Sequence, residues 1–595
     1  MAFAGLLTVS SCKKFLDVEN PSTISQEAVF NSISYSNSAV IAIYNQLMGD
    51  NGYGSRISLL YPMSADDFKT SGDYNPLDRR GISGYGASPD NTELNNPFLQ
   101  LYKGIERANI CIKYIPESDV YNNGSEADKA TMRKLYGEAL TLRAQFYHEL
   151  IRNWGDVPAP FLPASETPDL FLAKTDRDEI YDKLLEDLAT AAELVPWRSE
   201  TNDPSTRITK AAVKGLRARI ALARGGYSLR REPQMMIRRD NYKDFYKIAM
   251  DECASIIESG QHRLNPSFES LFKTLHNSNR QDPTNEWIFE AGAFGGNART
   301  DSKLGYGNGI RINANSSYGT ANGGVTAIPT YFYEFDSIGD SRRDVTLAYF
   351  EVDGTDNKVI TAAIDMRDGK YRKYWTSING TNQTLGINWP ILRYADVLLM
   401  YAESDNEING APSAKAIKAY EEVRKRAYTG HEDRIGATPT TKDEFFKAIV
   451  KERLLEFGGE GIRKYDLIRW NLLATVIDQT RANLRAFMLG EGRYANVPEY
   501  VYTKPNKLLN TTIPAEIADF DLSGGDVSKV MFTSAPADAP AGYTKKNWRA
   551  AVTEEYITGS RQGFALMFEP NKKELLPIYS GVLNQNFNLT QDYGY

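Results

Sequence analysis

The chain has 595 residues with a formal net charge of −7 at pH 7, and 24% of its residues are charged. Its length predicts roughly two to four structural units, and no segment approaches the ~18 consecutive apolar residues of a membrane-spanning helix. A nucleic-acid partner needs a basic surface, so the charge argues against one. The 35 tyrosines suit either a recognition surface or helix–helix interfaces, because each ring carries a polar tip.

The first residues are similar to the end of a bacterial lipoprotein signal. A short apolar run leads to Val9-Ser10-Ser11-Cys12, which resembles a lipobox, the motif whose cysteine is diacylated and becomes the mature N-terminus. Acyl chains tether a protein to a membrane without a spanning helix. We therefore expect residues 1–12 to be a signal peptide, truncated because its basic start is missing, and Cys12 to be the lipid attachment site.

The N-terminal half alternates between helices and one long irregular region. A helix is predicted over residues 26–48, and residues 49–96 are rich in Gly, Asn, Asp and Tyr with weak periodicity. Irregular regions of this length are usually functional or disordered. Four apolar stripes at helical spacing follow, and each needs a neighbouring helix to cover it, which predicts a helical array. The stripes are Leu135, Ala139, Leu142, Phe146 and Leu150; Ile180, Leu184, Leu188, Ala191 and Val195; Val213, Leu216, Ile220 and Ala223; and Phe245, Ala249, Cys253 and Ile256.

The C-terminal half repeats this organisation. Residues 287–290 predict a short strand, which opens a second irregular region at 292–388, rich in Gly, Asn and Thr. Helices are predicted again at 393–408, 413–427 and 443–457, and the stretch 490–595 reads as loop-rich with several prolines. Strands and helices do not alternate, so the pattern favours a mainly α fold interrupted by two large irregular regions over a parallel α/β fold.

Several segments that stand in order along the chain carry a family pattern. They are Arg143-Ala144-Gln145-Phe146-Tyr147 with Gly155-Asp156-Val157-Pro158; Thr206-Arg207-Ile208-Thr209-Lys210; Arg393-Tyr394-Ala395-Asp396-Val397-Leu398-Leu399-Met400-Tyr401-Ala402-Glu403; Glu452-Arg453-Leu454-Leu455-Glu456-Phe457 with Arg463-Lys464-Tyr465-Asp466-Leu467; and Leu576-Pro577-Ile578 with Leu589-Thr590-Gln591. Together they resemble the SusD/RagB family. Departures are local, at Gly458-Gly459 and Tyr579.

This resemblance implies a mainly α fold: a tetratricopeptide-like helical scaffold with large irregular loop regions and a few short strands. It implies an N-terminal SusD-like helical region at residues 13–270 and a C-terminal RagB/SusD region at residues 271–595. It also implies a lipid-anchored, surface-exposed protein of the outer membrane, which binds oligosaccharides and delivers them to a SusC-like TonB-dependent transporter.

Two other functions stay open at this stage. The RagB side of the family is associated with peptides, so capture of peptides or protein fragments for the same type of transporter is an alternative. A surface glycosidase needs only two facing carboxylates, and the chain has 76 acidic residues. No GxSxG, HExxH or GxxxxGK[ST] motif is present, so we expect a binding protein rather than an enzyme.

Eight charged residues inside the family segments look at first like a catalytic cluster. Charges at helical i, i+3 and i+4 spacing form ion pairs, and buried arginine–carboxylate pairs fix helices against one another. Unpaired buried charges are rare, so we interpret these residues as scaffold. They are Arg393, Asp396, Glu403, Arg453, Glu456, Arg463, Asp466 and Arg469.

Signals for metals and cofactors are weak, and we expect none. The three cysteines form no CxxC or Cys/His cluster. Asp519, Asp521 and Ser523 match the first half of a calcium loop, but its twelfth position is Val530 instead of a glutamate. A turn in which Asp and Ser bond their own backbone explains the three residues more simply.

The ligand site is expected in the two irregular regions, since loop residues carry function more often than core residues do. Aromatic rings stack on the C–H faces of sugars, while Asp, Asn and Arg bind hydroxyl groups. Nearby glycines let a ligand approach the backbone. The candidates are Asp73, Tyr74, Asn75 and Arg79 in the first region, and Tyr306, Asn308, Arg311 and Tyr318 in the second.

Overall fold

The computed structural model describes residues 25–276, 280–296, 301–378, 380–507 and 519–595. The predicted lipid site Cys12 lies outside these residues. The helices are α1 Gln26–Phe30, α2 Ile33–Tyr44, α3 Arg56–Leu59, α4 Arg79–Ser83, α5 Asn95–Tyr114, α6 Asp119–Asn123, α7 Glu126–Trp154, α8 Arg177–Leu194, α9 Lys210–Arg224, α10 Tyr242–Glu258, α11 Phe268–Lys273, α12 Arg343–Thr346, α13 Tyr394–Asn409, α14 Ala414–Ala427, α15 Lys442–Phe457, α16 Arg463–Arg469, α17 Leu473–Leu489, α18 Val527–Val530, α19 Glu554–Thr558 and α20 Ser580–Gln585.

The strands are short and form sheets of two or three strands among the described residues. All pairings between these strands are antiparallel in the described part of the chain. The strands are β1 Phe68–Thr70, β2 Ser228–Leu229, β3 Met236–Ile237, β4 Trp287–Ala291, β5 Val325–Ala327, β6 Leu347–Ala348, β7 Phe350–Val352, β8 Asn357–Ile360, β9 Arg367–Asp368, β10 Trp389–Arg393, β11 Tyr500–Lys504, β12 Asn506–Lys507, β13 Asp521–Leu522 and β14 Thr544–Asn547.

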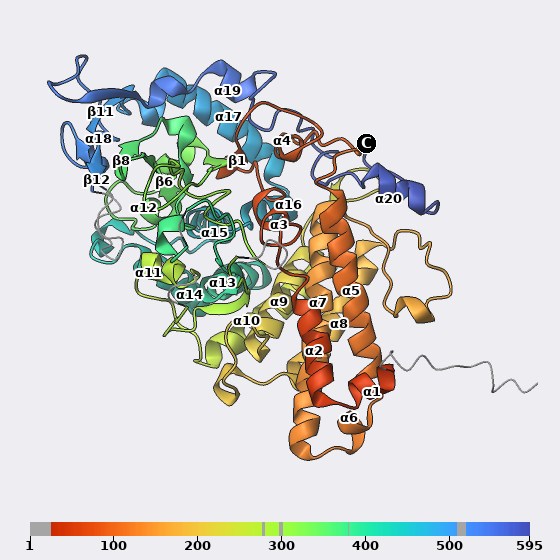
Figure 1. Cartoon of the computed structure of the whole chain (residues 1–595). Coiled ribbons are helices and arrows are strands. Elements are labelled where there is room, and N and C mark those ends of the chain that lie inside the picture. Colours follow the sequence, from red (N-terminus) through yellow and green to blue (C-terminus); the bar gives the residue numbers. More distant parts are fainter. Residues whose placement is uncertain (1–24, 277–279, 297–300, 379, 508–518) are drawn as a thin grey trace, which may run out of the picture.

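The long helices form a continuous array, and the predicted mainly α fold is confirmed. Each helix packs against the next one in the series α5, α7, α8, α9, α10, α13 and α14. Figure 1 shows this array running from the orange helices α5 and α7 through α9 and α10 to α13. The four predicted stripes lie in α7, α8, α9 and α10, and their residues belong to one buried core.

The ends of α7 follow from local chemistry. The Ser125 side chain accepts a hydrogen bond from the main-chain nitrogen of Asp128 (3.2 Å), which caps the first turn. Acidic Glu126 and Asp128 in that turn complement the helix dipole. The helix ends at Trp154 because Gly155 takes φ +78°, a conformation that favours glycine.

Three sequence expectations need correction. The predicted helix 26–48 is two helices, because Ser32 adopts an extended backbone and caps α2. Helix α17 was not predicted, although its buried Leu473, Ile477, Leu484 and Phe487 repeat at helical spacing. The C-terminal stretch is less irregular than expected, since β11 pairs with β13 on one side and β14 on the other.

A second hydrophobic core lies in this C-terminal part. It gathers α17 and α19 around Phe332, whose ring packs against Trp548 with centroids 5.7 Å apart. Figure 1 shows α17 and α19 beside β11, away from the base of the α5–α7 pair. The chain's last residues return to the helical array: Trp154 Nε1 donates to Pro577 O (3.0 Å) and Arg177 Nη2 donates to the Tyr593 hydroxyl (2.8 Å).

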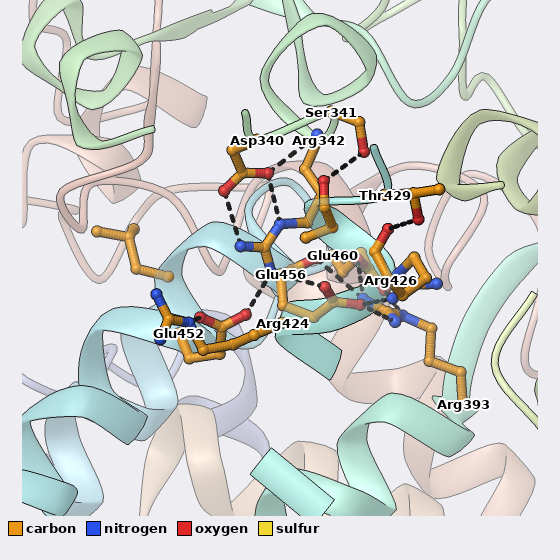
Figure 2. A network of polar contacts seen from close by, with 12 residues as sticks. Asp340, Ser341, Arg342, Arg393, Arg424, Arg426, Thr429, Glu452, Glu456 and Glu460 are labelled. Atoms are coloured by element: carbon orange, nitrogen blue, oxygen red, sulfur yellow. Dashed lines mark hydrogen bonds and ion pairs between the residues drawn. The ribbon is translucent and has the colours of Figure 1, made fainter. Parts of the chain in front are cut away.

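A buried ionic network joins α15 to α14, to the end of β10 and to the residue before α12 (Figure 2). Glu456 on α15 lies between Arg342, at 2.9 Å, and Arg393, at 2.5 Å, and also pairs with Arg426. Burial alone would raise the pKa of Glu456, but Arg426, Arg393 and Arg342 hold it well below its usual range. Such pairs fix the positions of helices, because each charge depends on its partner.

The other charged residues of the family segments are paired in the same way. Their geometry agrees with the scaffold interpretation, and each contact joins two different elements or two turns of one helix. The pairs are Arg453–Asp396 (2.7 Å), Arg453–Asp466 (2.6 Å), Arg463–Asp66 (2.7 Å), Arg469–Asp466 (2.7 Å) and Arg469 Nη2–Glu403 (2.8 Å).

Candidate functional site

The two irregular regions pack against each other and form one composite surface. Strand β1 of the first region pairs with β5 of the second, with Thr70 opposite Val325. Beyond the pairing, both the main chain and the hydroxyl of Ser71 donate to Gly324 O, at 3.1 and 3.0 Å. The structure therefore brings together the two segments from which the sequence candidates were drawn.

Three candidates of the first region are held by contacts within the fold. Asp73 accepts hydrogen bonds from Gln562 and Arg561, both at 2.6 Å, and these two bonds lower its pKa. Tyr74 is half-buried and donates through its main-chain nitrogen to Arg561 O (2.6 Å). The Asn75 side chain accepts from Leu77 N (3.0 Å), a turn that Asn commonly makes.

Arg79 differs from these three. It is the first residue of α4 and is exposed, and its side chain makes no hydrogen bond or ion pair with another described residue. A Cβ added to Gly324 would lie 3.9 Å from its Nη2, so the guanidinium reaches the place where β1 and β5 meet. Arg79 is thus available to a ligand at the composite surface.

The second region has one fully buried candidate. Asn308 is 0% exposed, its side chain accepts from Gly305 N (2.9 Å), and its amide donates to Asp368 (2.9 Å). Burial raises the pKa of Asp368 to about 7. Asn308 therefore shapes the loop from inside instead of facing a ligand.

Tyr306, Arg311 and Tyr318 lie nearer the surface. Tyr306 is half-buried against the main core, and Arg311 is exposed with only main-chain hydrogen bonds among the described residues. Tyr318 is half-buried, and its ring centroid lies 5.8 Å from that of Tyr374. Tyr374 is buried, so the half-buried ring of Tyr318 is the member of this pair that a sugar ring could reach.

Lys373 organises this part of the loop. Its Nζ donates to the main-chain oxygens of Thr320 (2.8 Å), Gly380 (2.8 Å) and Asn382 (2.9 Å), which draws three loop segments together. Burial lowers the pKa of Lys373 to about 8. The sequence analysis missed Lys373 and Tyr374, although the run Lys373-Tyr374-Trp375 is an unusually aromatic one for an irregular region.

Phe294 is the most exposed large apolar side chain of the described residues, at 87%. Its backbone is fixed: Arg280 donates to the oxygen of the preceding Ala293 (2.6 Å), and Gly295 (φ +108°) follows. A Cβ on Gly386 would lie 3.1 Å from Phe294 O, so Phe294 adjoins the segment that Lys373 organises. The sequence analysis missed it, because a single Phe before two glycines gives no periodic signal.

We call Phe294 and Tyr318 the loop platform, since both adjoin residues 373–386, and the buried Tyr374 of that segment packs against Tyr318. The platform and Arg79 and Arg311 offer what a sugar needs, namely rings for its C–H faces and donors for its hydroxyls. Exposed apolar surface is unfavourable in water, so covering the Phe294 ring with the C–H face of a sugar would be favourable.

The calcium half-motif lies elsewhere, in the small sheet of the C-terminal part. Asp521 is in β13 and accepts from the Tyr543 hydroxyl (2.8 Å), and Ser523 N donates to Tyr502 O (2.9 Å). Asp519 O accepts from the Asn506 amide (3.1 Å), and Val530 is buried in the second core. Among the described residues, no group of three or more His, Cys, Asp or Glu is placed to hold a metal ion.

No helix within the described ranges is long and apolar enough to cross a membrane.

Two family models match the sequence. One, described as the SusD family, matches residues 269–595, and another, described as starch-binding and associating with the outer membrane, matches residues 14–222.

Similar proteins and structures agree with these matches. A SusD-like protein of Formosa agariphila is 24% identical and covers 78% of this chain and 88% of its own length, and one of Bacteroides ovatus is 25% identical over 79% and 81%. A SusD homolog from Bacteroides thetaiotaomicron has a TM-score of 0.75 at 22% identity, covering 95% and 98% of the two chains. A surface glycan-binding protein of the same organism, solved in complex with laminarihexaose, has a TM-score of 0.61 at 18% identity, covering 94% and 99%.

Proposed function

The chain belongs to the SusD family, and from this premise we propose that it captures oligosaccharides at the cell surface without cleaving them. The observation that carries the proposal is Phe294, an 87% exposed ring on a fixed backbone that adjoins the loop segment at Gly386. Two kinds of evidence support it further: the composite loop surface, and the similarity in fold to a glycan-binding protein that holds laminarihexaose.

In this proposal the loop platform binds the faces of sugar rings. A stack on an aromatic ring contributes roughly 0.5–1.5 kcal/mol beyond its buried area. Arg79 and Arg311 supply donors for hydroxyl oxygens, and both side chains are exposed. Tyr74 and Asn308 act as framework, since their polar groups already bond within the fold.

We also propose that Cys12 carries the lipid anchor and that a SusC-like TonB-dependent transporter receives the captured oligosaccharide. The lipobox-like sequence before Cys12 supports the anchor, and the family supports the transporter. An acylated cysteine tethers a folded domain while leaving its loops free to bind a ligand.

Affinity electrophoresis in gels that contain single polysaccharides tests the proposal. Starch and laminarin are the first two to include, because the matched family model and a similar structure name these types of glycan. We expect retardation by at least one polysaccharide of the panel, and a parallel titration with a mixed tryptic peptide digest should give no heat. Binding of the peptides with no response to any glycan would favour the peptide alternative instead.

A further inference from the structure

A cavity lies inside the helical scaffold, apart from the loop platform. Its volume is about 90 Å³, and its walls come from α7, α8, α9, α13, α15 and α16 together with residues 227–229 and Leu575. At ~15 Å³ of such volume per water, it has room for roughly six waters. The cavity is therefore large enough for a small organic molecule, and nothing in the proposed glycan function uses it.

His148 lines this cavity and has one ring nitrogen without a partner among the described residues. It is 4% exposed, and its Nδ1 lies 3.2 Å from the hydroxyl of Tyr181. Burial lowers the pKa of His148 well below its usual value, so the ring is neutral and carries one proton. Nε2 has no hydrogen-bond partner in the described protein, and in the tautomer in which Tyr181 donates to Nδ1 this nitrogen carries the proton.

Four arginines in the cavity wall have spare donors as well. Each is neutralised by a carboxylate but has one nitrogen that bonds to no described residue. None of these four nitrogens is completely buried without a partner. The ion pairs are Arg152–Glu149 (2.7 Å), Arg177–Asp156 (2.7 Å), Arg219–Asp396 (2.5 Å) and Arg453–Asp466 (2.6 Å). The spare nitrogens are Nη1 of Arg152, Nη1 of Arg177, Nε of Arg219 and Nη2 of Arg453.

The rest of the wall is mixed: Tyr181, Tyr465, Ser228 and the arginine-paired Asp466 add polar groups, and aliphatic side chains cover a large part of it. Ile151, Leu222, Leu229, Met400 and Leu575 line it. A ligand that fills this space therefore needs an apolar body, while at least one end must accept several hydrogen bonds.

We propose that the cavity is a binding site for a small carboxylate on an apolar body, held by His148 Nε2 and the spare nitrogens of the arginines. Because each arginine already faces a carboxylate of the protein, recognition rests on directed hydrogen bonds and not on excess charge. Access runs past Ala223, Tyr227 and Ser228, which are half-buried members of the lining.

Benzoate is the probe for this site, and benzyl alcohol is its comparison, because it keeps the ring and lacks the carboxylate. Calorimetry of the folded protein should detect saturable benzoate binding at least about tenfold tighter than that of benzyl alcohol, since hydrogen bonds to a charged group are the stronger ones. Ala223→Phe should weaken benzoate binding by roughly tenfold or more by filling the entrance. His148→Leu should weaken it in the same direction.

The matched control is Ala254→Phe, on α10, a half-buried alanine that packs on the same core but does not line the cavity. It should leave benzoate binding unchanged, and circular dichroism should show that Ala223→Phe and Ala254→Phe are both folded. Equal affinity for benzoate and benzyl alcohol, no binding of benzoate, or equal binding by Ala223→Phe and Ala254→Phe would each overturn the proposal. A crystal soaked in benzoate that shows only water in the cavity would do so as well. The glycan assays test the loop platform and the benzoate assays test the cavity, so either proposal can be wrong while the other holds.

Discussion

The hydroxyl of Tyr74 donates a 2.8 Å hydrogen bond to the main-chain oxygen of Gly86. The ring also lies against Gly84, where an added Cβ would come within 3.0 Å of it. Both ends of this tyrosine are therefore occupied within the fold. It supports the first irregular region, and the exposed rings for a ligand are found in the second.

Tyr74→Phe removes that hydrogen bond and nothing else. We expect the free energy of unfolding to fall by about 0.5–1.5 kcal/mol, the usual net contribution of one hydrogen bond, with unchanged glycan affinity. Urea unfolding and affinity electrophoresis measure the two quantities. Unchanged stability combined with weaker binding would return Tyr74 to the ligand site.

Phe294→Ala should have the opposite profile. Its ring is 87% exposed, so stability should stay within roughly ±0.5 kcal/mol, while glycan binding should weaken by about 1 kcal/mol or more through loss of a stack. Phe587→Ala is the matched control, because that ring is also exposed, at 78%, but belongs to the segment after α20. Equal affinities for the two variants would remove Phe294 from the site.

Glu456→Ala tests the ionic network. It removes one buried carboxylate from each of Arg342, Arg393 and Arg426, and breaking buried pairs in this way costs about 3–5 kcal/mol. The arginines keep Asp340, Glu452, Glu286 and Glu460 as partners. We expect a large fall in the urea midpoint. Glu444→Ala, on the exposed face of the same helix, should change it little. A small effect at Glu456 would show that the remaining carboxylates are enough to hold the three arginines.

Lys464 predicts a pH dependence of stability. Burial lowers its pKa to about 7, and Nζ donates to Tyr61 O (3.0 Å). In the unfolded chain this lysine has an ordinary pKa, so above about pH 7 the unfolded chain binds more protons than the folded chain. The free energy of unfolding therefore rises with pH in this range, and the gain is lost as the pH falls through about 7. The free energy of unfolding of wild type minus that of Lys464→Met should rise by on the order of 1 kcal/mol per pH unit from pH 7.5 to 9.5.

Urea unfolding at a series of pH values measures this difference. The same substitution at the exposed Lys103 is the control for the loss of a lysine side chain. A difference for Lys464→Met that does not change with pH would mean that this lysine stays charged in the folded protein.

Cys12→Ala tests the proposed anchor. Lipidation needs the thiol, so the variant should leave the membrane fraction while the folded domain keeps its affinity for glycans. Cell fractionation, in a strain that lacks the transporter, measures this. Membrane retention of the variant in that strain would contradict the anchor.

The helical array could be predicted because its signal is periodic. Leu135 to Leu150 repeat at helical spacing, and Gly155 stops the helix where the sequence indicated. The scaffold role of Glu456 and its neighbours followed from the cost of unpaired buried charge. The break at Ser32 was missed, because a two-residue interruption hardly disturbs an apolar stripe.

The site was harder to predict, because its geometry depends on contacts far apart in the sequence. Asn308 looks like a polar loop residue, and only its bond to Asp368 shows that it is buried. Phe294 looks like an ordinary loop phenylalanine until its exposure is known. The pairing of β1 with β5, which joins the two irregular regions, has no local signal. The choice of ligand residues therefore stays a prediction.

The central claim is that the protein binds oligosaccharides and releases them intact. The most direct measurement is calorimetric titration with laminarihexaose and with other oligosaccharides from the polysaccharides that retard the protein, followed by chromatography of the ligand after prolonged incubation. The account predicts saturable binding to at least one oligosaccharide, which is recovered at its original length. Shortened products, or no binding of any oligosaccharide by the folded, full chain, would contradict it.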